Sequence, residues 1–245
     1  MMRIVIAAAA FALATGLQAA EITVFSSNAM KSVLEELVPQ FEKSTGHKVT
    51  PVFAPAADLK GRIDKREPYD VALLTAALMD ELAKDKHIAS ISRTNVAKAG
   101  AGVAVRRGAP KPDLSTAESF KQALLSAKSV AYVGSGATGA NLRAIFEKFG
   151  IAEEMKAKTK LLSGVGAADA VAQGEAELGF TQISEILPVA GAELAGPLPP
   201  EVQVFTQFAA ASSASAREPA AAYAFVRFLK TPAAASAIRE KGMEP

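Results

Sequence analysis

The sequence predicts an α/β fold in which a mainly parallel sheet is covered by helices. Short β-branched or aromatic runs alternate with stretches whose apolar residues recur at helical spacing. This alternation restarts after about residue 100. The chain has 245 residues, of which 50% are hydrophobic and 21% are charged. That composition is typical of a globular protein with two modest lobes or one large domain.

The N-terminal segment has the layout of a secretory signal peptide. Arg3 supplies the positive charge, an uncharged apolar stretch runs from Ile4 to Leu17, and small residues precede Glu21. A transmembrane helix needs about 20 apolar residues, and this stretch is shorter. The alternative is a buried N-terminal core helix. We expect residues 1–20 to be a signal peptide, and the exported chain to have no stable membrane insertion.

Composition and motifs exclude several classes of function. Lys and Arg number 27 against 25 Asp and Glu, which gives no basic field for a nucleic-acid partner. The absence of Cys removes thiol catalysis and thiolate metal sites. His47 and His87 lack H-E-x-x-H spacing, and no G-x-S-x-G elbow is present. We expect no nucleic acid, no metal and no cofactor.

Before residue 100 the expected elements alternate regularly. The strands are expected at residues 22–25, 49–53 and 69–74, and the helices at 30–41, 58–63 and 77–86. Gly46 is expected to end the first of these helices. Asp58 occupies the position of an N-cap for the second.

After residue 100 a second series follows. The strands are expected at residues 103–105, 129–133, 178–182 and 202–211, and the helices at 120–127, 140–149, 167–173, 218–230 and 233–241. Gly150 is expected to end a helix, and Ser184 to begin a turn or helix. The run from Gly196 to Pro200 breaks the pattern.

Three expected strands end in small polar turns that open helices, at Ser26–Asn28, Ala54–Asp58 and Gly134–Gly139. The first N–H groups of a helix lack internal partners and lie at the positive end of its dipole, so such turns bind anions. The alternative is that each turn is an ordinary N-cap. Gly134–Gly139 fits G-x-G-x-x-G, but Glu154, about 20 residues on, is not at a strand end, which excludes a dinucleotide site.

Four segments carry a resemblance to a known family. They are Ile22–Lys31, Tyr69–Ala72, Val133–Gly139 and Glu177–Ser184. In their order and spacing, they resemble the periplasmic molybdate-binding protein family of ABC importers. The resemblance implies the type II periplasmic binding protein fold, in which two α/β lobes joined by two crossings close over a small anion.

The same resemblance implies the organisation and partners of the chain. Lobe 1 is expected to comprise residues 21–100 with 204–245, and lobe 2 residues 101–203. The protein is expected to be a periplasmic monomer, with a small anionic ligand and an ABC permease as partners.

The serines and the tyrosine that hold the anion in that family are replaced here. Their positions correspond to Ala29, Pro55–Ala57 and Gln182. An organic di- or tricarboxylate is therefore expected in place of molybdate, because amide and guanidinium groups suit carboxylates. An arginine near the turns is expected to help, with a solvated arginine as the alternative. The expected ligand-binding residues are Ser27, Asn28, Ala56, Arg62, Ser135, Thr138 and Gln182.

An enzymatic function is the alternative to simple binding. The segment Gly179–Ile186 and the glycine turn also resemble the aconitate isomerase-like branch. That resemblance implies a shift of an allylic proton that interconverts cis- and trans-aconitate, which needs a positioned acid–base group. The candidates are Asp58, Tyr132 and Glu185. Their alternative roles are an N-cap, a residue of the strand core and an acid at a helix N-terminus, respectively.

Overall fold

The computed structural model describes residues 19–163 and 166–245. The predicted signal peptide lies outside the described residues except for its last two positions. No described helix has the length and hydropathy needed to cross a membrane.

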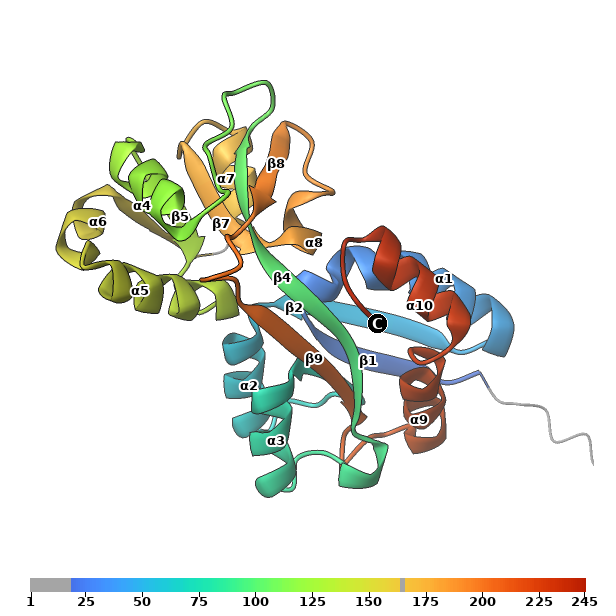
Figure 1. The fold of residues 1–245 in the computed structure, drawn as a ribbon. Helices are drawn as coiled ribbons and strands as arrows, with labels where there is room; N and C mark the ends of the chain where they lie inside the picture. Colours follow the sequence, from blue (N-terminus) through green and yellow to red (C-terminus); the bar gives the residue numbers. More distant parts are fainter. Residues whose placement is uncertain (1–18, 164–165) are drawn as a thin grey trace, which may run out of the picture.

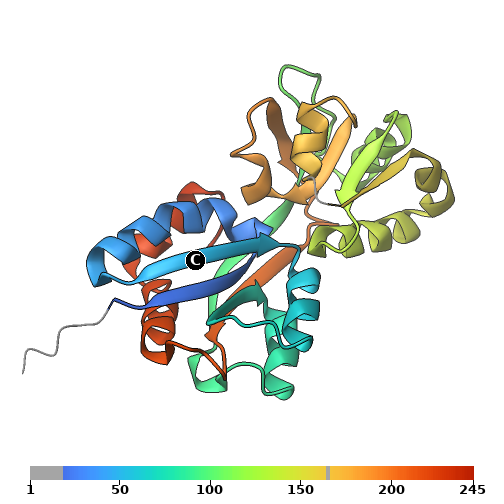
Figure 2. The same ribbon diagram turned by 180° about the vertical axis from the view of Figure 1, so that it is seen from behind.

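The described strands join in one long mixed sheet whose order is β2-β1-β3-β9-β4-β7-β5-β6, with β8 paired to β4 (Figure 1). The strands are β1 (Glu21–Ser27), β2 (Lys48–Ala54), β3 (Val71–Thr75), β4 (Thr94–Arg106), β5 (Val130–Val133), β6 (Thr159–Leu162), β7 (Leu178–Gln182), β8 (Ala192–Pro197) and β9 (Phe205–Ser212). The two halves of this sheet form the two lobes seen in Figures 1 and 2.

In the first lobe, helices cover both faces of the sheet. The helices are α1 (Lys31–Thr45), preceded by the short helix η1 (Asn28–Met30), α2 (Ala56–Asp64), α3 (Ala76–Lys84), η2 (Ser90–Ser92), α9 (Pro219–Phe228) and α10 (Pro232–Glu240). On one face, α1, α9 and α10 share a core around Leu37, Phe41 and Phe225. On the other face, α2 and α3 bury Leu59 and Met79. The central strand β3 is apolar and buried from Val71 to Leu74, as expected for a strand covered on both sides.

The second lobe repeats this arrangement on a smaller scale. Its helices are α4 (Ala117–Ser126), α5 (Ala137–Phe149), α6 (Ala152–Lys158), α7 (Ala167–Ala172) and α8 (Ile183–Ile186). On one face α4, α5 and α6 pack around Phe120, Phe146 and Phe180. On the opposite face, α7 and α8 contribute Ala168 and Ile186 to a smaller hydrophobic cluster.

Two segments cross between the lobes. The long strand β4 pairs with β9 over Thr94–Gly100 and with β7 over Ala101–Ala104. The return crossing leads into β9, and there the side chain of Gln203 accepts from the Ala101 N–H and donates to the Ala101 carbonyl. Every antiparallel pairing in the sheet involves β4 or β9. The predicted two-lobe α/β fold is confirmed, with a parallel centre in each lobe and antiparallel crossing strands.

Some predicted element boundaries were wrong. The expected strand 103–105 is the end of the much longer β4, and the last strand begins at Phe205 rather than at residue 202. Pro55 is the N-cap of α2, so Asp58 lies in the first helical turn. Gly46 and Gly150 do end α1 and α5 in the left-handed conformation, as predicted. The predicted lobe boundaries, residues 21–100 with 204–245 and residues 101–203, we keep as our proposal.

Candidate functional site

A small cavity of about 40 Å³ lies between the lobes at the carboxyl ends of the parallel strands. Ligands of α/β proteins collect at this edge of the sheet. The cavity is lined by Ser27, Asn28, Ala29, Pro55, Ala56, Thr75, Val133, Gly136, Thr138, Phe180, Thr181, Gln182, Glu185 and Phe208. Residues from both lobes therefore form one site.

Four helical segments point their N-termini at the cavity. Their N-cap residues are Ser27 for η1, which continues into α1, Pro55 for α2, Thr75 for α3 and Gly136 for α5. No side chain caps any of these four N-termini. Each carries about half a positive charge, so the four together supply about two without a charged side chain. Their free N–H groups make the cavity a site for an anion.

The glycine turn brings α5 close to β5. A Cβ atom at Gly139 would lie 2.5 Å from the Val133 carbonyl oxygen and 2.9 Å from the Tyr132 ring. Only glycine permits this approach of the first turn of α5 to the strand. The glycine motif thus positions the N-terminus of α5 against β5.

Gln182 places a polar side chain in the middle of the site. It is 3% exposed, and its Nε2 donates to Thr138 Oγ1 at 3.0 Å and to Thr206 Oγ1 at 3.1 Å. Its Oε1 has no hydrogen-bond partner among the described residues. A buried amide oxygen without a partner is costly, so this group is suited to a ligand donor. If the amide were turned over, the two hydroxyl groups would donate and Nε2 would be left free.

Glu185 contributes a carboxyl group to the same wall. Its Oε2 accepts from the Thr181 hydroxyl and, at 3.3 Å, from the Gln182 N–H. Burial raises the pKa of Glu185 above its ordinary value, and the negative charge of Asp169 adds to the rise, although these two hydrogen bonds act against it. In its neutral form the carboxyl group is a hydrogen-bond donor next to the anion site.

The remaining wall is apolar. Val133, Phe180 and Phe208 line the cavity, and none of its lining residues is Lys or Arg. Apolar walls with a few convergent polar groups are typical of sites for organic ligands. The cavity combines this apolar surface with the backbone donors.

The structure brings together five of the seven predicted ligand-binding residues. Ser27, Asn28, Ala56, Thr138 and Gln182 all line the cavity. Glu185, predicted as an acid–base candidate, lines it as well.

Thr75, Phe180 and Phe208 are among the lining residues that the sequence reasoning did not select. Thr75 ends a strand and precedes a helix, so the rule that selected the other turns would have found it. No local signal in the sequence marks the two phenylalanines.

The other candidates lie outside the lining. The Arg62 guanidinium pairs with Glu67 and lies 4.5 Å from the centre of the Phe25 ring. Tyr132 is buried in the core of the second lobe against Phe146.

Ser135 and Asp58 lie on opposite lobes, next to lining residues. Both are exposed, and the Ser135 hydroxyl donates to Asp58 Oδ2 at 3.4 Å. They thus form a weak contact between the lobes beside the cavity.

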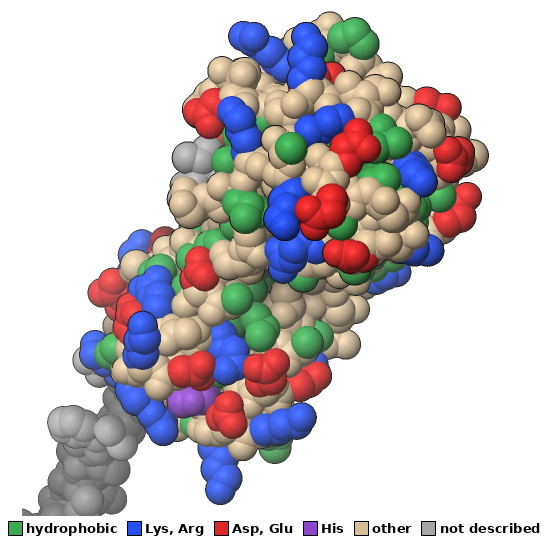
Figure 3. All heavy atoms as spheres, turned by 90° about the vertical axis from the view of Figure 1, so that its left-hand side faces the viewer, with side chains coloured by type: hydrophobic (Ala, Val, Ile, Leu, Met, Phe, Trp, Pro, Cys, Tyr) green, Lys and Arg blue, Asp and Glu red, His purple; other side chains and the backbone are tan. Residues whose placement is uncertain are grey.

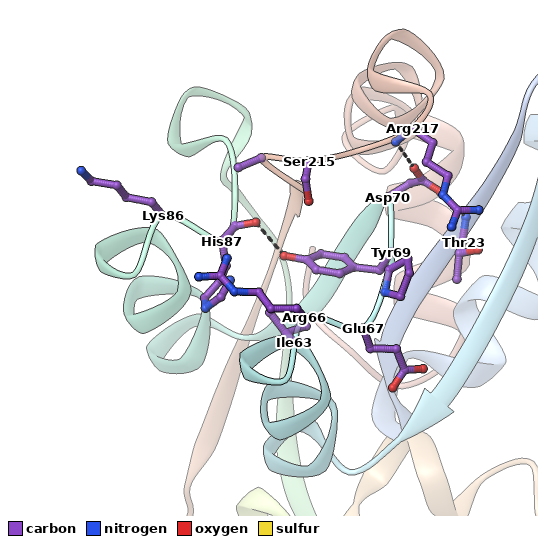
Figure 4. Close-up of a pocket in the computed structure, with 12 residues that line it drawn as sticks. Thr23, Ile63, Arg66, Glu67, Tyr69, Asp70, Lys86, His87, Ser215 and Arg217 are labelled. Carbon is purple, nitrogen blue, oxygen red and sulfur yellow. Dashed lines mark hydrogen bonds between the residues drawn. The ribbon is translucent and has the colours of Figure 1, made fainter.

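A second pocket, of about 340 Å³, lies at the amino ends of β1 and β3, away from the cavity (Figure 4). There Asp70 accepts from the backbone N–H groups of Thr23 and Arg217, and the Tyr69 hydroxyl donates to the His87 carbonyl. These bonds tie together strand ends and loops. Because the buried groups already have protein partners, we interpret this pocket as structural.

Charged side chains of both signs are intermixed over both lobes on the face drawn in Figure 3. This face therefore presents no extended field of one sign, in agreement with the formal net charge of +2. An anion must be held locally, by the cavity itself.

Comparison with known proteins identifies similar chains. The sequence model described as bacterial extracellular solute-binding protein matches residues 22–244. Aconitate isomerase of Pseudomonas sp is 35% identical over 230 residues, which are 91% of this chain and 87% of that protein. The molybdate-binding protein ModA of Azotobacter vinelandii is 28% identical over 187 residues, covering 75% of this chain and 73% of that protein.

The fold has a close counterpart among solved structures. The periplasmic molybdate-binding protein of Azotobacter vinelandii superimposes with a TM-score of 0.78 at 22% identity, over 91% of this chain and 99% of that chain. At this identity the match concerns the fold alone.

Proposed function

Because the chain belongs to the bacterial extracellular solute-binding protein family, as a type II member related to the molybdate-binding proteins, we propose that it binds a small polycarboxylate of the aconitate class between its lobes. The observation that carries this proposal is the convergence of four uncapped helix N-termini in one cavity with apolar walls. The N–H groups offset the carboxylate charges, and the apolar walls contact the carbon skeleton.

Two polar side chains of the cavity, Gln182 and Glu185, also suit a carboxylate ligand. The free end of the Gln182 amide can bond a carboxyl or hydroxyl group. A neutral Glu185 donates to a ligand carboxylate where an ionised one would repel it. The 35% identity to an aconitate isomerase supports the same ligand class.

A binding experiment with matched anions tests the proposal. Tricarballylate, citrate and cis-aconitate are expected to raise the melting temperature, because a ligand that binds only the folded state stabilises it by mass action. Molybdate, tungstate and sulfate are expected to have little effect at the same concentration and ionic strength. Stabilisation by the tetrahedral oxyanions alone would refute the proposal.

The buried carboxyl group of Glu185 favours a second function, the isomerisation of the bound tricarboxylate. In its ionised form, Glu185 takes a proton from the methylene carbon of aconitate, the electron pair delocalises over the allyl system, and the protonated Glu185 returns a proton to the other end. One C–H bond breaks, another forms and the double bond moves, so no oxidant or cofactor is required. A carboxyl group with a raised pKa suits both the removal and the return of the proton.

Turnover by the purified protein tests this second function. We expect interconversion of cis- and trans-aconitate, and a loss of about 10²–10⁴-fold in rate for Glu185→Gln, the range associated with general acid–base catalysis. The variant should still bind tricarballylate. Glu175→Gln is the control, because this exposed acid lies outside the cavity lining. Binding without turnover would leave a solute-binding protein without isomerase activity.

The family also supports a location and a partner. We propose that the protein acts in the periplasm and that, if it is a binder only, it delivers its ligand to an ABC permease. Growth of a deletion strain on tricarboxylates, with and without the permease, distinguishes delivery from conversion.

A further inference from the structure

Glu185 lines two separate pockets of the molecule. Besides the cavity between the lobes, it lines a larger hollow of about 550 Å³ between α1, α7 and α8. Asn28, Thr181 and Glu185 line both spaces. These three residues therefore form the partition between the ligand cavity and the larger hollow.

The hollow contains a second carboxylate from another element. Asp169 lies in the first turn of α7, is exposed and lines the hollow but not the cavity. The other charged residues lining the hollow are Lys31 and Glu35 of α1, whose charged groups lie 3.8 Å apart in an ion pair. Asp169 and Glu185 are thus the acids of the hollow without an ion-pair partner among the described residues. Its charge also contributes to the raised pKa of Glu185.

We propose that Glu185 exchanges its proton with solvent through this hollow, with Asp169 as the outer carboxylate that relays the proton, while the ligand occupies the cavity between the lobes. The inference rests on the proposed isomerase function and deepens it. The relay requires water in the hollow between the two carboxyl groups, since an ordered water bridges polar groups that are too far apart for a direct bond.

This arrangement has a chemical consequence for the reaction. The proton that Glu185 removes from the substrate passes to Asp169 and then to water. A proton from water follows the reverse route to Glu185 and forms the new C–H bond. In an isolated cavity the same proton would return to the substrate, so the isotope of the transferred hydrogen separates the two cases.

Turnover in D₂O tests the relay. The wild-type product is expected to carry solvent deuterium at the newly protonated carbon, and Asp169→Asn is expected to lose most of this deuterium while it still turns over. Glu175→Gln, which removes the same charge from a residue outside the hollow, is expected to keep it. Wild-type turnover without deuterium, or equal incorporation in Asp169→Asn, would overturn the proposal.

A second measurement does not depend on turnover. The infrared band of the protonated Glu185 carboxyl group, assigned by its loss in Glu185→Gln, shifts on exchange into D₂O. Asp169→Asn is expected to slow this exchange relative to wild type and to Glu175→Gln, and equal rates would refute the relay. If wild-type protein exchanges rapidly but does not convert aconitate, the isomerase proposal fails while the relay stands.

Discussion

At the scale of single residues, Gln182 joins the two lobes and the ligand cavity. Its amide donates to Thr138 in the second lobe and to Thr206 on the crossing strand β9, while Oε1 lacks a partner among the described residues. Polar groups that are buried in this way are retained for binding or for fixing a unique arrangement. One side chain therefore both lines the cavity and bonds to the crossing strand.

Gln182→Ala is expected to weaken tricarballylate binding about tenfold or more, corresponding to at least one lost hydrogen bond of about 1–2 kcal/mol. Isothermal titration calorimetry measures the change. Gln207→Ala is the control, because Gln207 lies on β9 and bonds the Ala97 carbonyl without lining the cavity. Equal effects of the two variants would contradict the assignment of Gln182 to the site.

Glu185 is expected to make stability depend on pH. Since its pKa is raised in the folded state, its protonation stabilises the fold fully below the unfolded pKa of about 4.3, and this contribution is lost as pH rises through the folded pKa. Glu185→Gln keeps the neutral form at every pH. Its stability relative to wild type should therefore increase from pH 4 to pH 8 in urea unfolding. A constant difference over this range would show that Glu185 is not protonated more readily in the folded state.

At the scale of elements, the side chain of Gln203 connects the two crossings by hydrogen bonds. Gln203 accepts from the Ala101 and Val204 N–H groups and donates to the Ala101 and Leu198 carbonyls.

Gln203→Ala should lower the free energy of unfolding by about 1–3 kcal/mol, because backbone groups at the crossing lose their partners. Urea unfolding measures this, with the exposed Gln122→Ala as control. A decrease in the free energy of unfolding no larger than that of the control would show that these hydrogen bonds do not stabilise the crossings.

At the scale of the whole molecule, the lobes must separate to admit the proposed ligand. The cavity of about 40 Å³ holds a few water molecules at most, whereas pockets for organic ligands are typically about 300–1,000 Å³. Contacts between the lobes oppose opening. Among them, Ser184 Oγ donates to the Ala29 carbonyl at 2.9 Å, and Ser32 Oγ donates to the Ser184 carbonyl at 3.4 Å.

Removal of one such contact is expected to open the molecule. Ser184→Ala should increase the radius of gyration of the ligand-free protein, measured by small-angle X-ray scattering, and saturating tricarballylate should reverse the increase. Ser44→Ala is the control, because its hydroxyl donates over 2.9 Å to the Phe41 carbonyl within α1. No difference between these variants would show that the Ser184 contact does not hold the lobes together.

Much of the fold was predictable because it depends on local signals. The apolar spacing of α1 and the left-handed glycines at the ends of α1 and α5 are properties of short segments. The length of β4 was missed since small residues such as Ala99 and Gly100 give no strand pattern, and their strand conformation depends on pairing with β9.

The sequence alone determined where backbone donors collect, because strands that end in small residues before a helix leave N–H groups free at a shared edge of the sheet. Only the tertiary structure decided which side chains line the cavity. Tyr132 and Val133 are neighbours on one strand and point to opposite faces, so one enters the core and the other lines the cavity. Arg62 pairs with Glu67, whereas Glu185 lines the cavity. These outcomes depend on how helices pack on the sheet within each lobe and on how the two lobes meet, which a short stretch of sequence does not specify.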